Sequence, residues 1–455
     1  MALGMKDISQ RVRSGERWGL ARDAVDAAGV ISPFVRIALA IQVFLATIAS
    51  LPSFAQGSPR AFTLPFTLVD NRVFVDVTLN GRGPFHFILD TGATADVSDS
   101  VAHHLGLYVR DAGEGQGVGA ATQHFGRTKV ASLRLGGLQL SDVQVSVLSL
   151  GDTPQVFGRQ PVDGILGSVV FERMVVKHDY VHRTLTFTPP DEYRYTGSGT
   201  VLAIERPRQI PMVQATLDSI PGAFGIDTGA RSALLLYGPY CEQNRLAAKY
   251  GAHLEGVTGW GIGGPVRSLL ARAHELDLGG VSVRDPIVRL STQKSGLTTS
   301  TAMAGLIGPD VLSQFDVTFD YARSRVILEK NANYGRRDSY DRAGVWMGQH
   351  GSNLTAVDVI AGGPADEAGV RAGVWMGQQG SSFTAVDVIA GGPADQAGLR
   401  AGDTILEIDG RSTEALSLPV VREQMSRRAV GEKVKLLLES QGKQRTVVVT
   451  LRDLA

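Results

Sequence analysis

The chain has 455 residues, a length that excludes a single compact domain and predicts two to four. Hydrophobic residues make up 43% of it and charged residues 20%, a balance that excludes general disorder and predicts folded cores. Basic and acidic side chains both number 45, so the net charge is +0, and we expect no nucleic-acid partner.

An apolar run near the N-terminus predicts export. Residues 37–51 form a run of 15 residues, shorter than the ~20 that a membrane-spanning helix needs. Arg36 precedes the run, and the small residues Ser53 and Ala55 follow it. We therefore predict that residues 1–55 are a signal peptide cleaved near Ala55, with Val35 as an alternative start. An uncleaved membrane anchor is the other interpretation, and both interpretations predict an exported, periplasmic or secreted protein.

The segment from about residue 60 to residue 333 follows one plan twice. Each pass contains an Asp-Thr-Gly-Ala motif, a glycine-rich stretch, a hydrophobic pair followed by glycine, and a closing pair of strands. The two aspartates of the motif, Asp90 and Asp227, are 137 residues apart, and the two later glycines, Gly167 and Gly308, are 141 apart. Alternating β-branched and polar residues around glycine pairs are typical of short strands joined by hairpins. The pattern predicts two related β-rich lobes, residues 60–196 and 197–333.

The two Asp-Thr-Gly motifs predict a pair of carboxylates that work together. Apolar residues precede each aspartate, so each aspartate is expected at the mouth of a buried strand. Gly92 and Gly229 allow a tight turn, and Thr91 and Thr228 can bond to the opposite loop. If the loops meet, one proton is shared by two carboxyl groups. The ionised group can activate a water, and the protonated group can polarise a peptide carbonyl.

These motifs resemble those of the retropepsin and pepsin class of aspartic peptidases. The resemblance depends on the two Asp-Thr-Gly-Ala motifs and on the sequences Ile165-Leu166-Gly167 and Leu306-Ile307-Gly308. It implies that the motif and the later glycine meet beneath each catalytic aspartate, and that a glycine-rich hairpin covers the substrate. The flap candidates are Gly117, Val118, Gly119, Trp260, Gly261 and Ile262. Plain hairpin turns are the alternative for these residues.

The residues that follow the motifs have their own consequences. Ala93 and Ala230 have no hydroxyl that could favour the charged carboxylate, so we expect a dyad that works closer to neutral pH. Arg231 has Thr94 as its counterpart in the first lobe. An Arg231 that faces the cleft would depress the pKa of the nearby aspartate, but a surface pair is the commoner arrangement.

The C-terminal part resembles a bacterial PDZ domain. Residues 345–373 recur as residues 374–402 with five changes in 29 positions, and we interpret 334–344 as a linker. The resemblance depends on residues 387–412 and implies a PDZ domain over 374–455 that binds an extended peptide, often the C-terminus of a protein. Either copy of the repeat could supply the first strands, and we favour the second because it is contiguous with the rest. The groove candidates are Trp375, Met376, Gly377, Phe383, Val386 and Val388.

The sequence thus predicts a mainly β protein with two pseudo-symmetric acid-protease-type lobes followed by an α+β PDZ domain. We expect an exported aspartic endopeptidase, with Asp90 and Asp227 as the dyad and the PDZ domain recruiting substrates or partners. A non-catalytic peptide-binding protein is the alternative. With a single cysteine, Cys241, and no histidine ligand spacing, we expect no metal and no cofactor. A monomer is expected, and a dimer with two mixed sites is the weaker alternative.

Overall fold

The structure is a computed structural model. It describes residues 60–150, 157, 160–206, 210–340, 345–350, 353–359, 404–440, 442–451 and 453. By its contacts the protein divides into two units, Met1–Ser58 and Pro59–Ala455. The predicted signal peptide and its cleavage site at Ala55 lie outside the described residues. No described helix is long and apolar enough to span a membrane.

The first pass of the repeat forms an eight-stranded sheet with the order β2-β3-β4-β9-β5-β8-β7-β6. Its strands are β2 (Thr67–Val69), β3 (Arg72–Leu79), β4 (Arg82–Leu89), β5 (Ala95–Ser98), β6 (Arg110–Gln116), β7 (Thr122–Leu135), β8 (Leu138–Leu148) and β9 (Gly164–Leu166). Two short helices, α2 (Asp99–His104) and α4 (Ser168–Phe171), follow β5 and β9. The predicted alternation of apolar and polar residues is clearest in β7, where every second residue from Gly126 to Val130 is buried.

The second pass forms a nine-stranded sheet with the order β16-β17-β20-β15-β21-β14-β13-β18-β19. Its strands are β13 (Met212–Leu217), β14 (Ile220–Ile226), β15 (Leu234–Leu236), β16 (Leu254–Gly261), β17 (Gly264–Arg272), β18 (Glu275–Asp277), β19 (Ser282–Arg284), β20 (Ile287–Ser291) and β21 (Gly305–Ile307). Its helices are α5 (Gly238–Gln243), α6 (Leu246–Lys249) and α7 (Pro309–Leu312). The helices α2 and α5 follow equivalent strands, as do α4 and α7, so the two passes share one topology.

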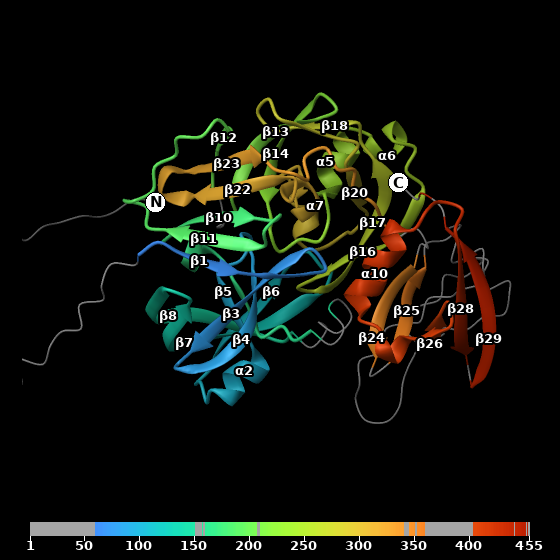
Figure 1. Cartoon of the computed structure of the whole chain (residues 1–455), viewed down its shortest axis with the longest axis horizontal. Coiled ribbons are helices and arrows are strands. Elements are labelled where there is room, and N and C mark those ends of the chain that lie inside the picture. The colour runs from blue at the N-terminus through green and yellow to red at the C-terminus, as the bar shows by residue number, and fades with distance from the viewer. Residues whose placement is uncertain are drawn as a thin grey trace, which may run out of the picture. The chain divides into compact units, whose positions relative to one another are not determined.

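A third sheet joins the two passes. It has the order β1-β11-β10-β22-β23-β12 and takes three strands from each pass (Figure 1). The strands are β1 (Phe62–Pro65), β11 (Thr184–Thr188), β10 (Val175–Asp179), β22 (Phe315–Asp320), β23 (Arg325–Lys330) and β12 (Thr200–Ala203). The two halves meet where β10 pairs antiparallel with β22, His178 opposite Val317. One buried hydrophobic cluster runs through both lobes and this sheet, so they share a single core.

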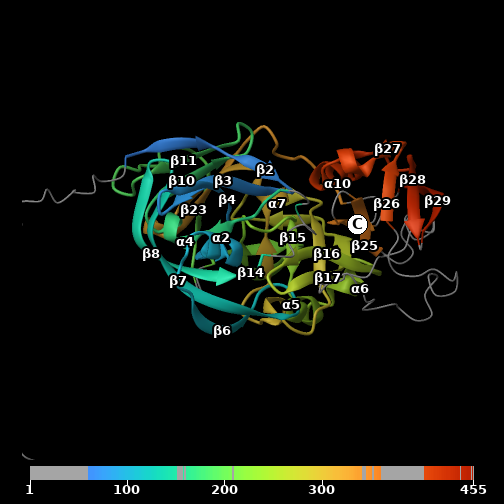
Figure 2. The same cartoon turned by 90° about the horizontal axis from the view of Figure 1, so that it is seen from below.

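The C-terminal part has its own sheet and its own core. The sheet contains β24 (Val345–His350), β25 (Asn353–Val359), β26 (Thr404–Ile408), β28 (Lys433–Ser440) and β29 (Lys443–Thr450), with β27 (Arg411–Ser412) beside β26. Helix α10 (Leu418–Arg427) lies beside it (Figure 2). Leu418, Val421 and Met425 recur at helical spacing, and they are buried against the strands.

The first copy of the repeat supplies strands of this sheet in the described structure. Strand β25 comes from the first copy and pairs with β26, Leu354 opposite Ile405. The second copy, residues 374–402, which we favoured, lies outside the described residues, so that choice stays a prediction. The physical reason for the ambiguity is that the copies are nearly identical, so strand pairing cannot distinguish them by side-chain chemistry.

The segment that we interpreted as a linker is anchored at its start. The carboxylate of Asp338 accepts hydrogen bonds from Arg272 Nη1 and from the backbone N–H of Ile287, both at 2.8 Å. Tyr340 is buried against Leu270 and Ile287. At least one of the segment's charged residues, Asp338, is therefore paired with the second lobe.

Candidate active site

Each aspartate of the Asp-Thr-Gly motifs sits at the end of a strand that pairs in parallel with the later hydrophobic pair. Strand β4 pairs with β9, Leu89 opposite Leu166, and β14 pairs with β21, Ile226 opposite Ile307. The backbone N–H groups of Asp90 and Asp227 each donate to the residue before the later glycine, at 2.9 Å in both lobes. The two loops are therefore held by the same bonds.

The two threonines tie the loops together across the lobes. The backbone N–H of Thr91 donates to Oγ1 of Thr228 at 3.0 Å, and the backbone N–H of Thr228 donates to Oγ1 of Thr91 at 3.1 Å. Each hydroxyl donates in turn to the opposite lobe, to the carbonyls of Ile226 and Leu89. Both threonines are fully buried, so all four bonds are shielded from water.

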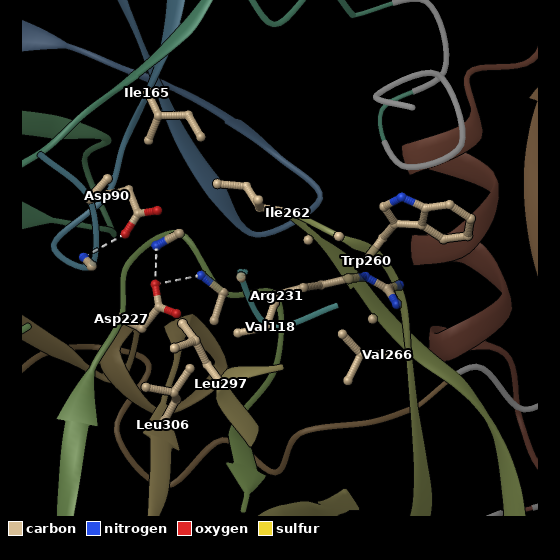
Figure 3. Close-up of a pocket in the computed structure, with 18 of the residues that line it drawn as sticks. Asp90, Val118, Ile165, Asp227, Arg231, Trp260, Ile262, Val266, Leu297 and Leu306 are labelled. Carbon is tan, nitrogen blue, oxygen red and sulfur yellow. Dashed lines mark hydrogen bonds between the residues drawn. The ribbon is translucent and has the colours of Figure 1, made fainter. Parts of the chain in front are cut away.

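The carboxyl groups of Asp90 and Asp227 lie side by side at the floor of a cavity, close enough for the charge of one to act on the pKa of the other. Figure 3 shows the backbone donors that fix them. Oδ1 of Asp90 accepts from the N–H of Gly92 at 2.6 Å. Oδ1 of Asp227 accepts from two N–H groups, those of Gly229 at 2.8 Å and Ala230 at 3.0 Å. The dyad is thus built from equivalent loops but is not symmetric.

The electrostatics of the pair follow this asymmetry. Burial, and after it the charge of Asp227, raises the pKa of Asp90 well above its ordinary value. Burial also raises the pKa of Asp227, but the hydrogen bonds from Asp90, Gly229 and Ala230 act to lower it. The additional N–H donor therefore favours the ionised form at Asp227, and the burial and neighbouring charge favour the protonated form at Asp90.

An arginine from the first lobe reaches the loop of Asp227. Nε of Arg72 donates to the carbonyl of Gly229 at 2.8 Å, and its Nη1 pairs with Asp70 at 2.6 Å. The positive charge of Arg72 lowers the pKa of Asp227. Asp70 and Arg72 were not among the site residues predicted from the sequence. A charged pair beside an apolar strand was the available signal, but nothing in it pointed to a partner 157 residues away.

Arg231 lines the cavity and is held there by an ion pair. Its Nε donates to Oδ1 of Asp70 at 2.8 Å, and its side chain is 16% exposed. It is therefore paired, but in the interior rather than on the outer surface. Arg72 is an arginine whose charge lowers the pKa of Asp227.

The flap candidates form two hairpins whose tips meet. The first is β6 and β7, with Gly117, Val118 and Gly119 in its turn, and the second is β16 and β17, with Ile262 in its turn. The N–H of Gly119 donates to the carbonyl of Ile262, and the N–H of Ala121 donates to that of Gly263, both at 3.0 Å. A Cβ on Gly117 or Gly119 would overlap the other hairpin, which explains the glycines in the first tip.

The cavity beneath the hairpins has a volume of about 690 Å³ and is bounded by both lobes. Apolar side chains line much of it, among them Ile165, Trp260, Val266 and Leu306 (Figure 3). The charged residues of the lining are Asp90, Asp96, Asp227, Arg72, Arg231 and Arg289. This volume and lining are typical of a pocket that takes a small molecule or a few residues of a peptide.

One further titratable group of the cavity escaped the sequence analysis. Asp96, on β5, lines the cavity, and burial raises its pKa to about 6 although Ser146 donates a hydrogen bond to it. The described residues contain no group of three or more side chains that could hold a metal ion. The groove candidates Trp375, Met376, Gly377, Phe383, Val386 and Val388 lie outside the described residues.

Comparisons with known proteins agree with this geometry. Residues 75–170 match the family model of the aspartyl protease, and residues 384–440 match that of the PDZ domain. Among solved structures, the protein is similar to an aspartic proteinase from Irpex lacteus, with 15% identity and a TM-score of 0.39 over 61% of this chain and 99% of that one. No curated protein matches. The two family matches confirm the predicted resemblance to aspartyl proteases over residues 75–170 and to PDZ domains over residues 384–440, and the sheets confirm the predicted mainly β fold.

Proposed function

We propose that the protein is an exported aspartic endopeptidase that hydrolyses peptide bonds with a water held between Asp90 and Asp227. One observation carries the proposal: two loops that bond to each other bring two buried carboxyl groups together at the floor of a cavity, and two hairpins cover this cavity. A retained fold without catalysis would not require both carboxyl groups to be buried together, because an unneeded buried acid is costly.

The asymmetry of the dyad assigns the two roles. Asp227 is the ionised member and takes a proton from the water as its oxygen attacks the peptide carbonyl carbon. Asp90 is the protonated member and donates to the carbonyl oxygen, which gives a neutral tetrahedral diol. The proton on Asp227 then passes to the amide nitrogen, the C–N bond breaks, and a diol proton returns to Asp90. The step needs no covalent intermediate.

The pH range of activity follows from the same assignment. Activity requires one proton on the pair, so it is lost at low pH when Asp227 is protonated and at high pH when Asp90 ionises. The raised pKa of Asp90 extends the range toward neutral pH. An optimum below about pH 3 would contradict this part of the proposal.

Cleavage of a mixed peptide library by the purified protein, from pH 3 to pH 8 and with pepstatin as a probe, tests the function. Asp90→Asn and Asp227→Asn should each lower kcat by about 100-fold or more, because each removes one half of the acid–base pair. Asp142→Asn is the matched control, since Asp142 is exposed and pairs with Lys129. A folded wild-type protein that cleaves nothing at any pH would favour the peptide-binding alternative.

Three finer parts of the proposal have their own tests. The apolar run at 37–51 supports export, and cell fractionation with N-terminal sequencing checks it.

The PDZ domain at 384–440 supports recruitment of an extended peptide. Deletion of this domain should abolish the recruitment while cleavage of small peptides continues. Because both aspartates come from one polypeptide, we propose an active monomer, and a dimer mass in gel filtration would contradict it.

A further inference from the structure

The cavity wall contains a buried arginine that no acidic side chain neutralises directly. Arg289, on β20, lines the cavity and is only 7% exposed. Its Nε is buried without a hydrogen bond, and its guanidinium lies 5.6 Å from the centre of the Tyr340 ring. Among the described residues, no carboxylate forms a hydrogen bond or an ion pair with it. Burial of an unpaired charge is costly, so the position calls for an anion.

The nearest acidic groups are engaged elsewhere. Asp338 accepts from Arg272 and from the backbone of Ile287, and Asp310 accepts from Asn71 at 2.7 Å. They act on Arg289 only through space. The neighbouring guanidinium of Arg231 repels Arg289, and its own Nε is held by Asp70. Arg231 is thus paired with a carboxylate, whereas Arg289 lines the cavity with none hydrogen-bonded or ion-paired to it among the described residues.

The equivalent wall of the first lobe is different. Strand β15 pairs with β20 so that Leu235 lies opposite Arg289, and β5 pairs with β8 so that Asp96 lies opposite Ser146. Both pairs stand beside the cavity, and Leu235, like Asp96, lines it. Arg289 and Ser146 therefore occupy equivalent positions in the two lobes. In the first lobe, the charged group of this wall is the carboxyl group of Asp96. The two sides of the cleft have opposite charge preferences.

We infer that the wall around Arg289 is a receptor for a peptide carboxylate, so that the enzyme selects an acidic residue or a free C-terminus over its second lobe. This inference rests on the proposed peptidase function. A guanidinium can bind a carboxylate by two parallel hydrogen bonds. The apolar neighbours Leu235, Val266 and Leu306 would pack against the aliphatic part of such a residue.

A matched peptide set tests the inference on the full-length protein. Each position within four residues of the cleaved bond carries either Glu or Gln, and each peptide is made with a free or an amidated C-terminus. We expect kcat/KM to be about 10- to 100-fold higher for Glu at one position, as a charge-assisted pair predicts. A loss on amidation instead would identify the C-terminus as the source of the carboxylate. Equal rates for all pairs would overturn the inference.

Variants assign the effect to Arg289. In Arg289→Met, which keeps the volume and removes the charge, the Glu-to-Gln ratio should fall to near one, whereas Arg289→Lys should retain part of it. Arg284→Met, at an exposed position of the same lobe, is the control and should keep the wild-type ratio. Persistence of the full ratio in a folded Arg289→Met protein would also overturn the inference.

The test separates this inference from the peptidase proposal. If neutral peptides are cleaved with no preference for a carboxylate, the peptidase proposal stands and the receptor does not. If nothing is cleaved, anisotropy with labelled members of the same set, bound to the wild type and to Arg289→Met, measures the preference without catalysis. A preference that Arg289→Met loses would support the receptor, and its absence would overturn it.

Discussion

The two lobes share their backbone and differ in the polar side chains placed on it. The aspartates, threonines and later glycines make the same bonds in both. Around this frame, Asp90 accepts one backbone N–H and Asp227 accepts two. Arg72 in the first lobe and Ile210 in the second occupy equivalent positions. Each lies two residues before a strand residue, Phe74 or Met212, that pairs with the equivalent residue of the neighbouring strand, Ile88 or Gly225.

This difference shows how a repeat can produce a catalytic pair with distinct members. Two identical carboxyl groups would hold the proton equally, and neither would be committed as base or acid. An extra N–H donor and the charge of Arg72 favour the ionised form of Asp227. Burial and the charge of Asp227 raise the pKa of Asp90. Substitutions at equivalent positions of the two lobes test this explanation.

The largest expected effect comes from the shared sheet. His178 aligns with Phe319 of the second repeat, is fully buried, and has its pKa lowered by burial to about 3. Its unfolded form takes up a proton below about pH 6.5 and the folded form does not, so stability is lost as pH falls from there toward 3. His178→Phe should remove about 3 kcal/mol of this loss between pH 7 and pH 4, measured by urea unfolding.

The control for this change is the exposed His253→Phe, which should not alter the pH dependence. Equal losses of stability in wild type and His178→Phe between pH 7 and pH 4 would show that the buried imidazole does not limit acid stability.

The next effect concerns the two glycines of the motifs. A Cβ on Gly229 would overlap the carboxyl group of Asp90, whereas a Cβ on Gly92 would lie 3.2 Å from Oδ1 of Asp90. Gly229→Ala should therefore lower kcat by about 100-fold, because it displaces the acid, and Gly92→Ala should lower it less. Steady-state kinetics on one peptide compares the two variants directly, and equal kcat values would contradict the described loop geometry.

Arg72 provides the third comparison. Arg72→Met leaves buried Asp70 with one partner fewer, and should lower the free energy of unfolding by about 2 kcal/mol. It also removes a charge that lowers the pKa of Asp227, so the acidic limb of the pH–rate profile should move to higher pH. The control Ile210→Met should cost less than about 1.5 kcal/mol and leave the limb in place. An unmoved limb in Arg72→Met would exclude its action on Asp227.

The smallest effect is a gain of stability. A raised pKa means that the folded protein binds the proton of Asp90 more tightly than the unfolded chain, so its contribution is present at low pH and is lost as pH rises. Asp90→Asn should therefore raise Tm at pH 7, by roughly 2–4 °C for each kcal/mol gained, and the gain should shrink toward pH 4. Asp227→Asn should gain less, because its carboxylate accepts more N–H donors. Calorimetry of both variants at both pH values would reveal the reverse order if the assignment is wrong.

Much of the fold was predictable because the information is local and occurs twice. Apolar residues before each aspartate and the hydrophobic pair before each later glycine sufficed to predict the paired strands β4–β9 and β14–β21. The anchoring of Asp338 and Tyr340 was not predictable, since a charged segment without apolar period has the same composition whether it is solvated or paired. The copy of the repeat that supplies β25 was not predictable either.

By itself, the sequence determined the repeat, the two Asp-Thr-Gly motifs and the chemistry that two adjacent carboxyl groups can perform. The tertiary structure decided how the surroundings of the two carboxyl groups differ, because that depends on N–H donors and on a guanidinium that approaches from the other lobe. It also decided that the two hairpins meet and that Arg289 faces the cavity without a carboxylate partner among the described residues. Burial and electrostatic interactions depend on residues that are more than a hundred positions apart in the sequence but close in space. A local sequence pattern does not predict which of them become neighbours.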